Sequence, residues 1–263
     1  MKNSFRILSF LKFLLRSKGL HRVHSPFVFH LYHELIRRGQ HYSDFDKLNS
    51  IRLALRNNKS PIQRAGIGAS SKPGKETIAE IAGKILSTQH WCEAFYRIAT
   101  HAKPQCIVEL GTGLGLSTLY WAKAAPQAQV HTFEGDAALA NLDRALFERE
   151  KAFNITLHEG LFEETLPAYL QTKPRIDIAF IDGDHTYEAT LRNFRMLLSF
   201  LHENSIVIFD DIHWSSGMER AWSEIKSMTE VQQSIDFFRL GMVFFRTSQA
   251  RQHFYLRGTY FGF

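Results

Sequence analysis

The sequence has few of the residues that mark secreted, fibrous or membrane-spanning proteins. Only two of its 263 residues are cysteine, which excludes a disulfide scaffold and makes the reducing cytoplasm the expected location. No uncharged stretch approaches the roughly 20 apolar residues that a membrane span needs. Hydrophobic residues make up 44% and charged residues 22% of the chain, as in a globular protein. A chain of this length fits one catalytic-size domain with an appendage.

Acidic residues are scarce at the start of the chain. Residues 1–75 contain fifteen lysines and arginines but only three aspartates and glutamates, whereas residues 76–263 contain seventeen and twenty-three. The first region therefore carries a formal charge of +12 and the second −6, which add up to the +6 of the whole chain. We expect a basic helical extension over 1–75 and a catalytic domain over 76–263.

Residues 1–20 have the pattern of an amphipathic basic helix. Its predicted apolar stripe consists of Phe5, Leu8, Leu11 and Leu15. Basic residues interrupt the apolar run and no small-residue cleavage site follows, so a signal peptide is not indicated. The pattern favours packing on the chain's own domain or on a second copy in a homodimer. Binding to an anionic membrane surface or to nucleic acid is a less favoured alternative.

From residue 76 onward, short apolar runs alternate with helical stretches. The strand-like runs cover residues 106–110, 130–133, 155–158, 176–181 and 205–209. Strands separated by helices predict an α/β fold, a mostly parallel sheet with helices on both faces. Two last runs, 234–238 and 242–245, have only three residues between them, which permits only an antiparallel hairpin.

Glycines follow the first predicted strand, at the point where a helix begins. Residues 111–115 read Gly-Thr-Gly-Leu-Gly, so the backbone can approach a ligand that also meets the free amides of the helix. The dinucleotide fingerprint G-x-G-x-x-G would need glycine in place of Leu116, so this motif alone is a weak signal. Glu134 ends the next strand 23 residues after Gly111, about where a carboxylate binds a ribose. Together these features predict a nucleotide-like cofactor pocket.

Four segments carry a resemblance to a known family: VELGTGLGLSTLYWA, VHTFEGD, IDIAFIDGDHTYEATLRNFRMLL and IVIFDDIHWSSGMERAW. They resemble the class I S-adenosylmethionine-dependent methyltransferases. Within these, the chain is similar to small-molecule O-methyltransferases of the catechol and macrolide-sugar kind, and to an uncharacterised bacterial branch that shares its VHSPF and GASSK segments. The resemblance implies a Rossmann-like seven-stranded sheet of order 3-2-1-4-5-7-6, numbered along the chain, with strand 7 antiparallel.

The resemblance also implies S-adenosylmethionine as cofactor and a set of residues that bind it. The methionine portion would meet Glu109, Gly111, Thr112, Gly113 and Ser117. Glu134 would bind the ribose hydroxyls, and Gly160, Leu161 and Phe162 would border the adenine. In one alternative, Asp182 contacts the cofactor amine.

Acidic residues end two neighbouring strands. Asp182 ends the fourth predicted strand, and Asp210 and Asp211 end the fifth; neighbouring strands lie about 4.8 Å apart, so these carboxylates can converge. Without a counter-ion they would repel one another, and oxygen ligands favour Mg²⁺, Mn²⁺ or Ca²⁺ over zinc. The resemblance implies Mg²⁺ here, since the catechol and sugar enzymes bind it at such acids. In the alternative, Asp210 and Asp211 cap a helix or bond loop amides.

Two histidines are candidates for a general base. His185 completes Asp-Gly-Asp-His after the fourth strand, and the resemblance to the sugar enzymes places the base there. His213 follows the acidic pair and, with Trp214, could line an acceptor pocket. A neutral histidine suits removal of a hydroxyl proton, although either residue could be an ordinary loop histidine.

Two absences narrow the acceptor. The fourth strand does not end in the Asn-Pro-Pro-Tyr or Asp-Pro-Pro-Tyr of adenine methyltransferases, and neither cysteine follows a proline, as the covalent cytosine mechanism requires. We therefore expect metal-assisted O-methylation of a small-molecule hydroxyl, with residues 1–75 docked at the C-terminal edge of the sheet. Residues 57–74, rich in Lys, Ser, Gly and Pro, would be a linker or a lid over the acceptor pocket. The alternatives are a metal-independent enzyme acting on RNA or a lipid headgroup, and a non-catalytic cofactor-binding module.

Overall fold

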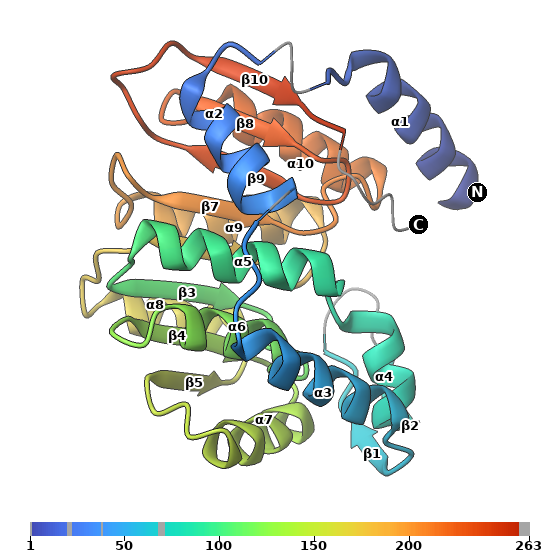
Figure 1. Ribbon diagram of the computed structural model, residues 1–263. Helices are drawn as coiled ribbons and strands as arrows, with labels where there is room; N and C mark the ends of the chain where they lie inside the picture. Colours follow the sequence, from blue (N-terminus) through green and yellow to red (C-terminus); the bar gives the residue numbers. More distant parts are fainter. Residues whose placement is uncertain (1, 20–22, 38, 68–71, 258–263) are drawn as a thin grey trace.

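The computed structural model describes residues 2–19, 23–37, 39–67 and 72–257 of the chain. One mixed sheet of eight strands lies at the centre, with helices around it (Figure 1). From edge to edge the strands are β5 (Ile155–Glu159), β4 (Gln129–Glu134), β3 (Cys106–Leu110), β6 (Ile178–Ile181), β7 (Ile206–Phe209), β9 (Gly241–Phe244), β8 (Gln233–Asp236) and β10 (Gln252–Tyr255). All neighbours pair in parallel except β9, which is antiparallel to β7 and β8. This is the predicted α/β fold class.

The far edge of the sheet holds one strand more than the sequence indicated. The first seven strands from β5 to β8 follow the expected order, and β8 and β9 form the expected hairpin. Strand β10 then pairs in parallel with β8. Its four residues, Gln-His-Phe-Tyr, are exposed or half-buried, so no apolar run marks it in the sequence.

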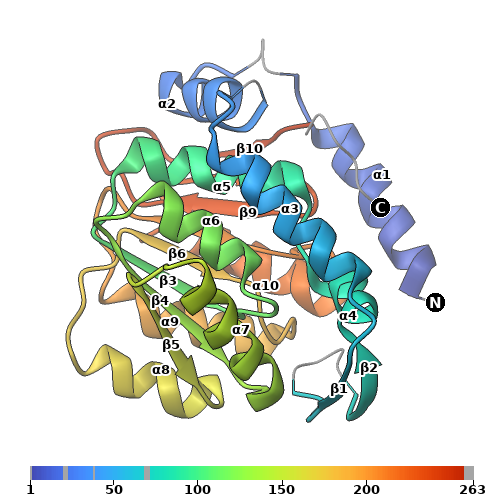
Figure 2. The same ribbon diagram turned by 60° about the horizontal axis from the view of Figure 1, so that its bottom comes forward.

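The inner strands are apolar at every position because helices cover both faces of the sheet. Strands β6 and β7, for example, are buried along their whole length. Ile178 and Phe180 of β6 face one layer, and Ala179 and Ile181 face the other. The first layer contains α3 (Asp44–Asn57), α5 (Gln89–Ala102), α6 (Leu116–Ala124) and α7 (Ala137–Arg149), and the second contains α8 (Phe162–Leu170), α9 (Tyr187–Leu198) and α10 (Ser216–Ser227) (Figure 2).

Most of the basic region shares the core of the sheet. A second helix, α2 (Pro26–His30), is capped by the Ser25 side chain and continues as the π-helix η2 (Leu31–Arg37). Helix α3, which the sequence analysis did not predict, follows. Ile36 of η2 and Phe45 of α3 are buried in the same apolar cluster as α5 and α6. These helices therefore stabilise the first layer.

The segment expected to be a linker or lid contains regular structure. Strand β1 (Pro61–Arg64) pairs antiparallel with β2 (Gly74–Thr77), and α4 (Ile78–Ile85) follows with a capping box between Thr77 and Glu80. Residues 68–71, which hold most of the GASSK motif, lie outside the described residues. The segment over 57–74, expected to be a linker or a lid, thus includes the strand β1.

The predicted orientation of the first helix is also wrong. Helix α1 (Lys2–Arg16) forms, but Leu8, Leu11 and Leu15 of the predicted stripe are 54%, 51% and 88% exposed. Its buried residues are Ser9 and Phe13 instead, at 3% and 2% exposure. None of the described helices combines the length and the apolarity that crossing a membrane requires.

Candidate functional site

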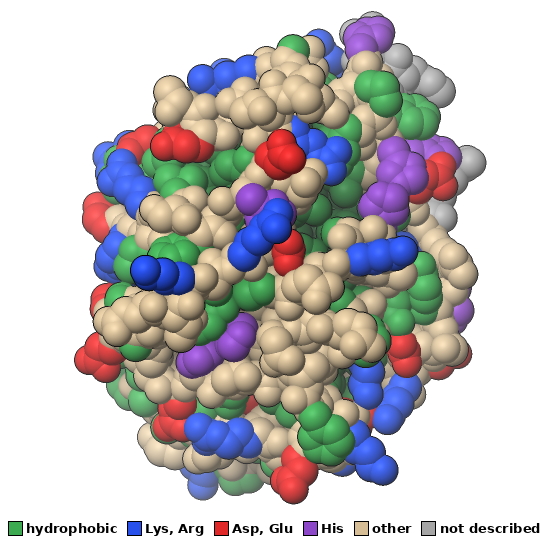
Figure 3. Space-filling view, turned by 90° about the vertical axis from the view of Figure 1, so that its left-hand side faces the viewer, with side chains coloured by type: hydrophobic (Ala, Val, Ile, Leu, Met, Phe, Trp, Pro, Cys, Tyr) green, Lys and Arg blue, Asp and Glu red, His purple; other side chains and the backbone are tan. Residues whose placement is uncertain are grey.

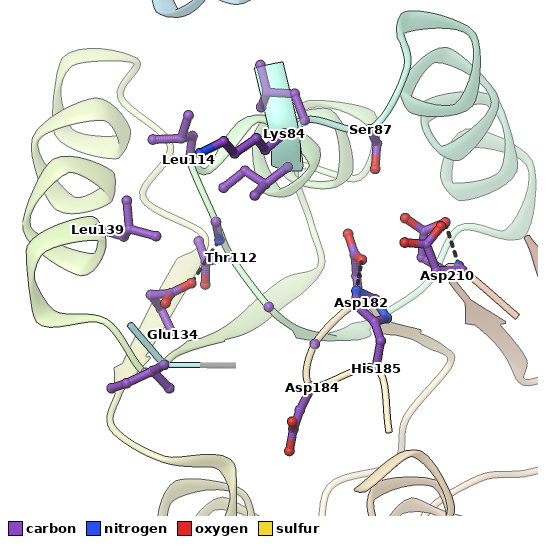
Figure 4. A pocket seen from close by; sticks show the side chains of 18 of the residues that line it. Lys84, Ser87, Thr112, Leu114, Glu134, Leu139, Asp182, Asp184, His185 and Asp210 are labelled. Carbon is purple, nitrogen blue, oxygen red and sulfur yellow. Dashed lines mark hydrogen bonds and ion pairs between the residues drawn. The ribbon is translucent and has the colours of Figure 1, made fainter. Parts of the chain in front are cut away.

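A cavity of about 1200 Å³ opens at the C-terminal ends of the central strands (Figure 4). Parallel strands of an open α/β sheet place their ligands at this edge. A pocket for one small ligand occupies about 300–1,000 Å³, so this cavity has room for two reactants. Its two ends have different chemistry: a glycine turn with Glu134 at one end, and a cluster of acidic residues with His185 at the other.

The glycine turn lies between β3 and α6. Gly111 has φ of 104°, and a Cβ there would come within 2.3 Å of the Asp182 carbonyl oxygen, so only glycine fits. Gly113 has φ of 66° and leaves its backbone open to the cavity. Thr112 and Ser117 also line the cavity, and Ser117 lies in the first turn of α6, where amides are unpaired. These four predicted residues are thus brought together.

Glu134 lies at the end of β4 and is 8% exposed. The amide of Gly113 donates to its Oε2 and the amide of Asp136 donates to its Oε1, both at 2.9 Å. Burial raises the pKa of Glu134 despite these two hydrogen bonds. Each carboxylate oxygen keeps a lone pair for a further donor, so the group is held in place and can still accept from two hydroxyls.

The segment after β1 covers this end of the cavity. Arg64 Nε and the Ala65 amide donate to Asp136 Oδ2 at 3.1 and 3.2 Å, next to Glu134. The Ile67 side chain lies against Gly135. The described residues of the predicted lid therefore contact the end of the cavity with Glu134, whereas we expected the lid over the acidic end.

Two predicted cofactor residues do not reach the cavity. Glu109 is fully buried beneath it, where Thr118 and Thr132 donate to its carboxylate, and burial raises its pKa to about 7. Gly160 is not part of the lining either. It lies in a turn, where its φ is 133°. Leu161 and Phe162 do line the cavity, with Phe162 packed against Gly183.

The acidic cluster has an internal counter-ion. Arg239, in the turn between β8 and β9, donates from Nε to Asp210 Oδ1 at 3.1 Å and from Nη2 to Asp210 Oδ2 at 3.0 Å. Its Nε also lies 3.7 Å from Asp211 Oδ1. Such a two-point contact between guanidinium and carboxylate is among the stronger ion pairs. Arg239 is thus a counter-ion within the protein, which the sequence did not indicate.

The charges within the cluster are unequal. Burial acts to raise the pKa of Asp210, but Arg239 outweighs it and holds the pKa below its usual value. Burial and the neighbouring Asp210 raise the pKa of Asp211. Burial, followed by the charges of Asp210 and Asp211, raises the pKa of Asp182 far above its usual value. Arg239 therefore favours the ionised form of Asp210, while burial and neighbouring negative charge act against ionisation of Asp182 and Asp211.

These residues, as arranged, do not fit a divalent cation. Both oxygens of Asp210 accept hydrogen bonds from Arg239, whose positive charge would repel a cation. Within residues 2–19, 23–37, 39–67 and 72–257, no group of three or more His, Cys, Asp or Glu side chains is placed to hold a metal ion.

His185 lies at the acidic end of the cavity, where Figure 4 shows it beside Asp182. Its Nε2 is 3.6 Å from Asp182 Oδ1, and its side chain is 21% exposed. Asp184, just before it, has φ of 52°, a left-handed backbone that turns the chain back toward the cavity. The imidazole can therefore meet a ligand while a carboxyl group orients it.

His213 has partners at both of its ring nitrogens. Its Nε2 lies 2.9 Å from Asp236 Oδ2, its Nδ1 lies 3.1 Å from Ser9 Oγ, and its ring stacks on Phe238. Burial opposes its charge, but Asp236 and then Glu219 outweigh burial and raise the pKa of His213 to about 9. His213 lines the cavity with Trp214, as expected, but both of its ring nitrogens already have partners and its pKa is raised, so the arrangement does not favour it as the general base. It fastens α1 to the domain.

The lining residues that the sequence did not indicate include Arg239, Phe238 and Arg6. The first two lie in the hairpin turn, where Phe238 has φ of 73° and packs against Phe10 of α1. The Arg6 guanidinium lies 4.7 Å from the centre of the Trp214 ring. Only the short hairpin connection was visible in the sequence, and nothing local marks these residues as neighbours.

Comparison with known proteins identifies the central part of the chain. Residues 108–212 match a family described as a methyltransferase domain. Over 68 residues, the chain is 32% identical to the uncharacterized protein R132 of Acanthamoeba polyphaga mimivirus. That stretch covers 24% of this chain and 31% of the viral protein, so the match spans about a third of that relative.

Solved structures share the fold at low identity. The O-methyltransferase from Bacillus cereus, in complex with SAH, is 16% identical with a TM-score of 0.56, over 82% of this chain and 95% of that one. The O-methyltransferase TomG from Streptomyces achromogenes, in complex with SAM and involved in tomaymycin synthesis, is also 16% identical. Its TM-score is 0.54, over 62% of this chain and 82% of that one.

Replacing Arg239 with methionine should leave Asp210 buried without its partner. We expect Arg239→Met to lower the free energy of unfolding by about 2–4 kcal/mol at pH 7. The deficit should shrink toward pH 5, because Asp210 can then take up a proton in the variant. Urea denaturation at both pH values measures it. The matched control is Arg195→Met, an exposed pair with Glu224 that should cost less than about 1 kcal/mol; equal losses in both variants would contradict the assignment.

The His213 contact should make stability depend on alkaline pH. Its pKa is about 9 in the folded protein and 6.5 in the reference state, so its stabilisation is complete below pH 6.5 and is lost as the pH rises through 9. Relative to His213→Gln, wild type should lose on the order of 3 kcal/mol between these limits. Denaturation curves of both proteins at the two pH values measure this loss. If wild type and His213→Gln lose the same free energy of unfolding between them, His213 is not charged in the folded protein.

Proposed function

We propose that this chain, which carries an S-adenosylmethionine-dependent methyltransferase domain of the class I fold, transfers a methyl group to a hydroxyl oxygen of a small molecule. The observation that carries the proposal is the two-ended cavity. One end offers glycine backbone and a held carboxylate, and the other offers a histidine beside a carboxyl group. A donor and an acceptor can therefore meet over the carboxyl ends of β3 and β6.

The end with Glu134 suits S-adenosylmethionine. When bound, this cofactor supplies an electrophilic sulfonium methyl group. Gly111 and Gly113 allow its methionine part to approach the backbone, and Ser117 can donate to its carboxylate from the start of α6. Glu134 can accept from both ribose hydroxyls, since two amides already fix its orientation. Leu161 and Phe162 offer an apolar border for the adenine.

The acidic end suits an uncharged hydroxyl acceptor. The Nε2 atom of His185 faces Asp182 Oδ1 at 3.6 Å, so Asp182 would orient the ring, and the other ring nitrogen, Nδ1, would take the hydroxyl proton as the oxygen attacks. Trp214 and Phe238 provide aromatic walls, which suits an acceptor with a flat apolar body. Helix α1 lies across this end through Arg6, which favours a small molecule over a polymer.

In this proposal, proton transfer to His185 requires no bound metal ion. Arg239 already supplies a fixed positive charge beside the acidic cluster and holds Asp210. A cation at this place would first have to displace a two-point ion pair, which adds a cost that the proton transfer to His185 does not require. Activity should therefore be insensitive to chelators.

The cofactor assignment is tested at Glu134. Glu134→Ala removes both ribose acceptors, so affinity for S-adenosylmethionine should fall at least tenfold, or about 1.4 kcal/mol. Calorimetry measures it. Glu159→Ala is the matched control, because Glu159 ends the adjacent strand β5 and forms its ion pair with Arg144 outside the cavity; it should bind like wild type. Unchanged affinity in Glu134→Ala would contradict the assignment.

The base is tested at His185. We expect His185→Gln to lower the rate of methyl transfer about 10²–10⁴-fold while leaving S-adenosylmethionine affinity unchanged. The readout is formation of S-adenosylhomocysteine with a panel of catechols and hydroxylated sugars. His202→Gln removes a histidine that pairs with Asp177 at 2.9 Å outside the cavity, and should keep full activity. A variant at position 185 as fast as wild type would show that another group takes the proton.

A further inference from the structure

Helix α1 carries an apolar surface that no described part of the chain covers. Ile7, Leu8, Leu11 and Leu15 are 59%, 54%, 51% and 88% exposed. At spacings of one, four and eight residues from Ile7, they lie on one side of the helix, which we call the α1 stripe. The other large exposed apolar side chains lie singly on separate segments: Phe29, Leu53, Ile67, Phe153 and Leu161. Single ones are ordinary, whereas a cluster marks an interaction site.

The α1 stripe cannot turn inward without loss of the contacts on the opposite side of the helix. Phe10 and Phe13 pack against Phe238 with ring centres 4.9 and 5.6 Å apart. Ser9 bonds the protonated His213 and donates to Glu219 at 3.1 Å. Figures 1 and 2 both place α1 at the periphery of the molecule, with no other described helix or strand over its outer side.

The charged residues of α1 itself are all basic. Lys12 and Arg16 are exposed and adjoin the stripe on the helix surface. No acidic residue occurs before Glu34 in the whole sequence. The face of the molecule in Figure 3 differs, since side chains of both signs are scattered there among small hydrophobic areas. A partner for α1 must therefore accept apolar side chains and carry negative charge.

We propose that the α1 stripe docks on an anionic membrane surface. Leucine and isoleucine side chains on one side of a helix, with basic residues at its border, suit the boundary between headgroups and acyl chains. Lys12 and Arg16 would meet the negative lipid headgroups. A second copy of this chain is the less suitable occupant, because pairing two α1 helices brings their basic residues together without an acidic residue between them.

The position of α1 links this surface to the pocket. Arg6 on its inner side lines the cavity, while the α1 stripe faces outward from the same helix. A membrane that holds α1 would therefore lie beside the acceptor end of the cavity. Binding to the surface does not depend on the proposed methyl transfer, so each can be tested alone.

Sedimentation of the full-length chain with vesicles tests the proposal. At physiological salt it should sediment with vesicles of phosphatidylcholine and phosphatidylglycerol, and much less with phosphatidylcholine alone. Leu11→Ser/Leu15→Ser and Lys12→Gln/Arg16→Gln should each weaken binding at least tenfold. The matched control Leu53→Ser/Phe153→Ser changes two exposed apolar residues elsewhere and should bind like wild type. The four apolar residues replaced in these variants are all exposed. Circular dichroism checks that each variant is folded.

Three results would overturn the proposal. Wild type that stays in the supernatant with anionic vesicles would show that the α1 stripe binds no such surface. Equal binding by the α1 variants and the Leu53/Phe153 control would show that another region binds the lipid. A wild-type dimer in sedimentation velocity that Leu11→Ser/Leu15→Ser converts to a monomer, without vesicle binding, would show that a second copy covers the stripe.

Discussion

The ion pair between Arg239 and Asp210 makes the acidic end of the cavity possible. Three carboxyl groups converge there because β6 and β7 are neighbouring parallel strands that end at the same edge. Their mutual repulsion is relieved by one guanidinium from the hairpin turn between β8 and β9. The same turn is tied to the end of β7 by the Ile212 amide, which donates to the Arg239 carbonyl oxygen at 3.1 Å. The hairpin that contains the antiparallel strand β9 thus positions the counter-ion.

That turn also organises the contact with α1. Asp236 at its start accepts from the His213 ring and from the Trp222 indole, each at 2.9 Å, and Phe238 receives the aromatic residues of α1. The acidic cluster, His213 and helix α1 are therefore connected through this turn. A substitution in residues 236–241 should therefore alter both the lining of the cavity and the position of α1.

The sequence predicted what local patterns determine. Apolar runs located the seven strands from β3 to β9, and the glycine turn with Glu134 at the next strand end located one end of the cavity, because each feature depends on neighbouring residues. The roles of His213 and Arg239 depend on partners 23 and 29 residues away, and the Ser9–His213 contact spans 204 residues. The orientation of α1 was mispredicted for the same reason: Ser9 is buried because His213 and Glu219 meet it, not because it is apolar.

The central claim is that Arg239 takes the place of a metal in a cavity whose other end binds S-adenosylmethionine. A crystal structure grown with S-adenosylhomocysteine and millimolar Mn²⁺, with anomalous data to locate manganese, tests it most directly. The account predicts the ligand over Gly111 and Gly113 with its ribose on Glu134, both Asp210 oxygens bonded to Arg239, and no anomalous peak there. A manganese peak between Asp182 and Asp210, with Arg239 displaced, would contradict it.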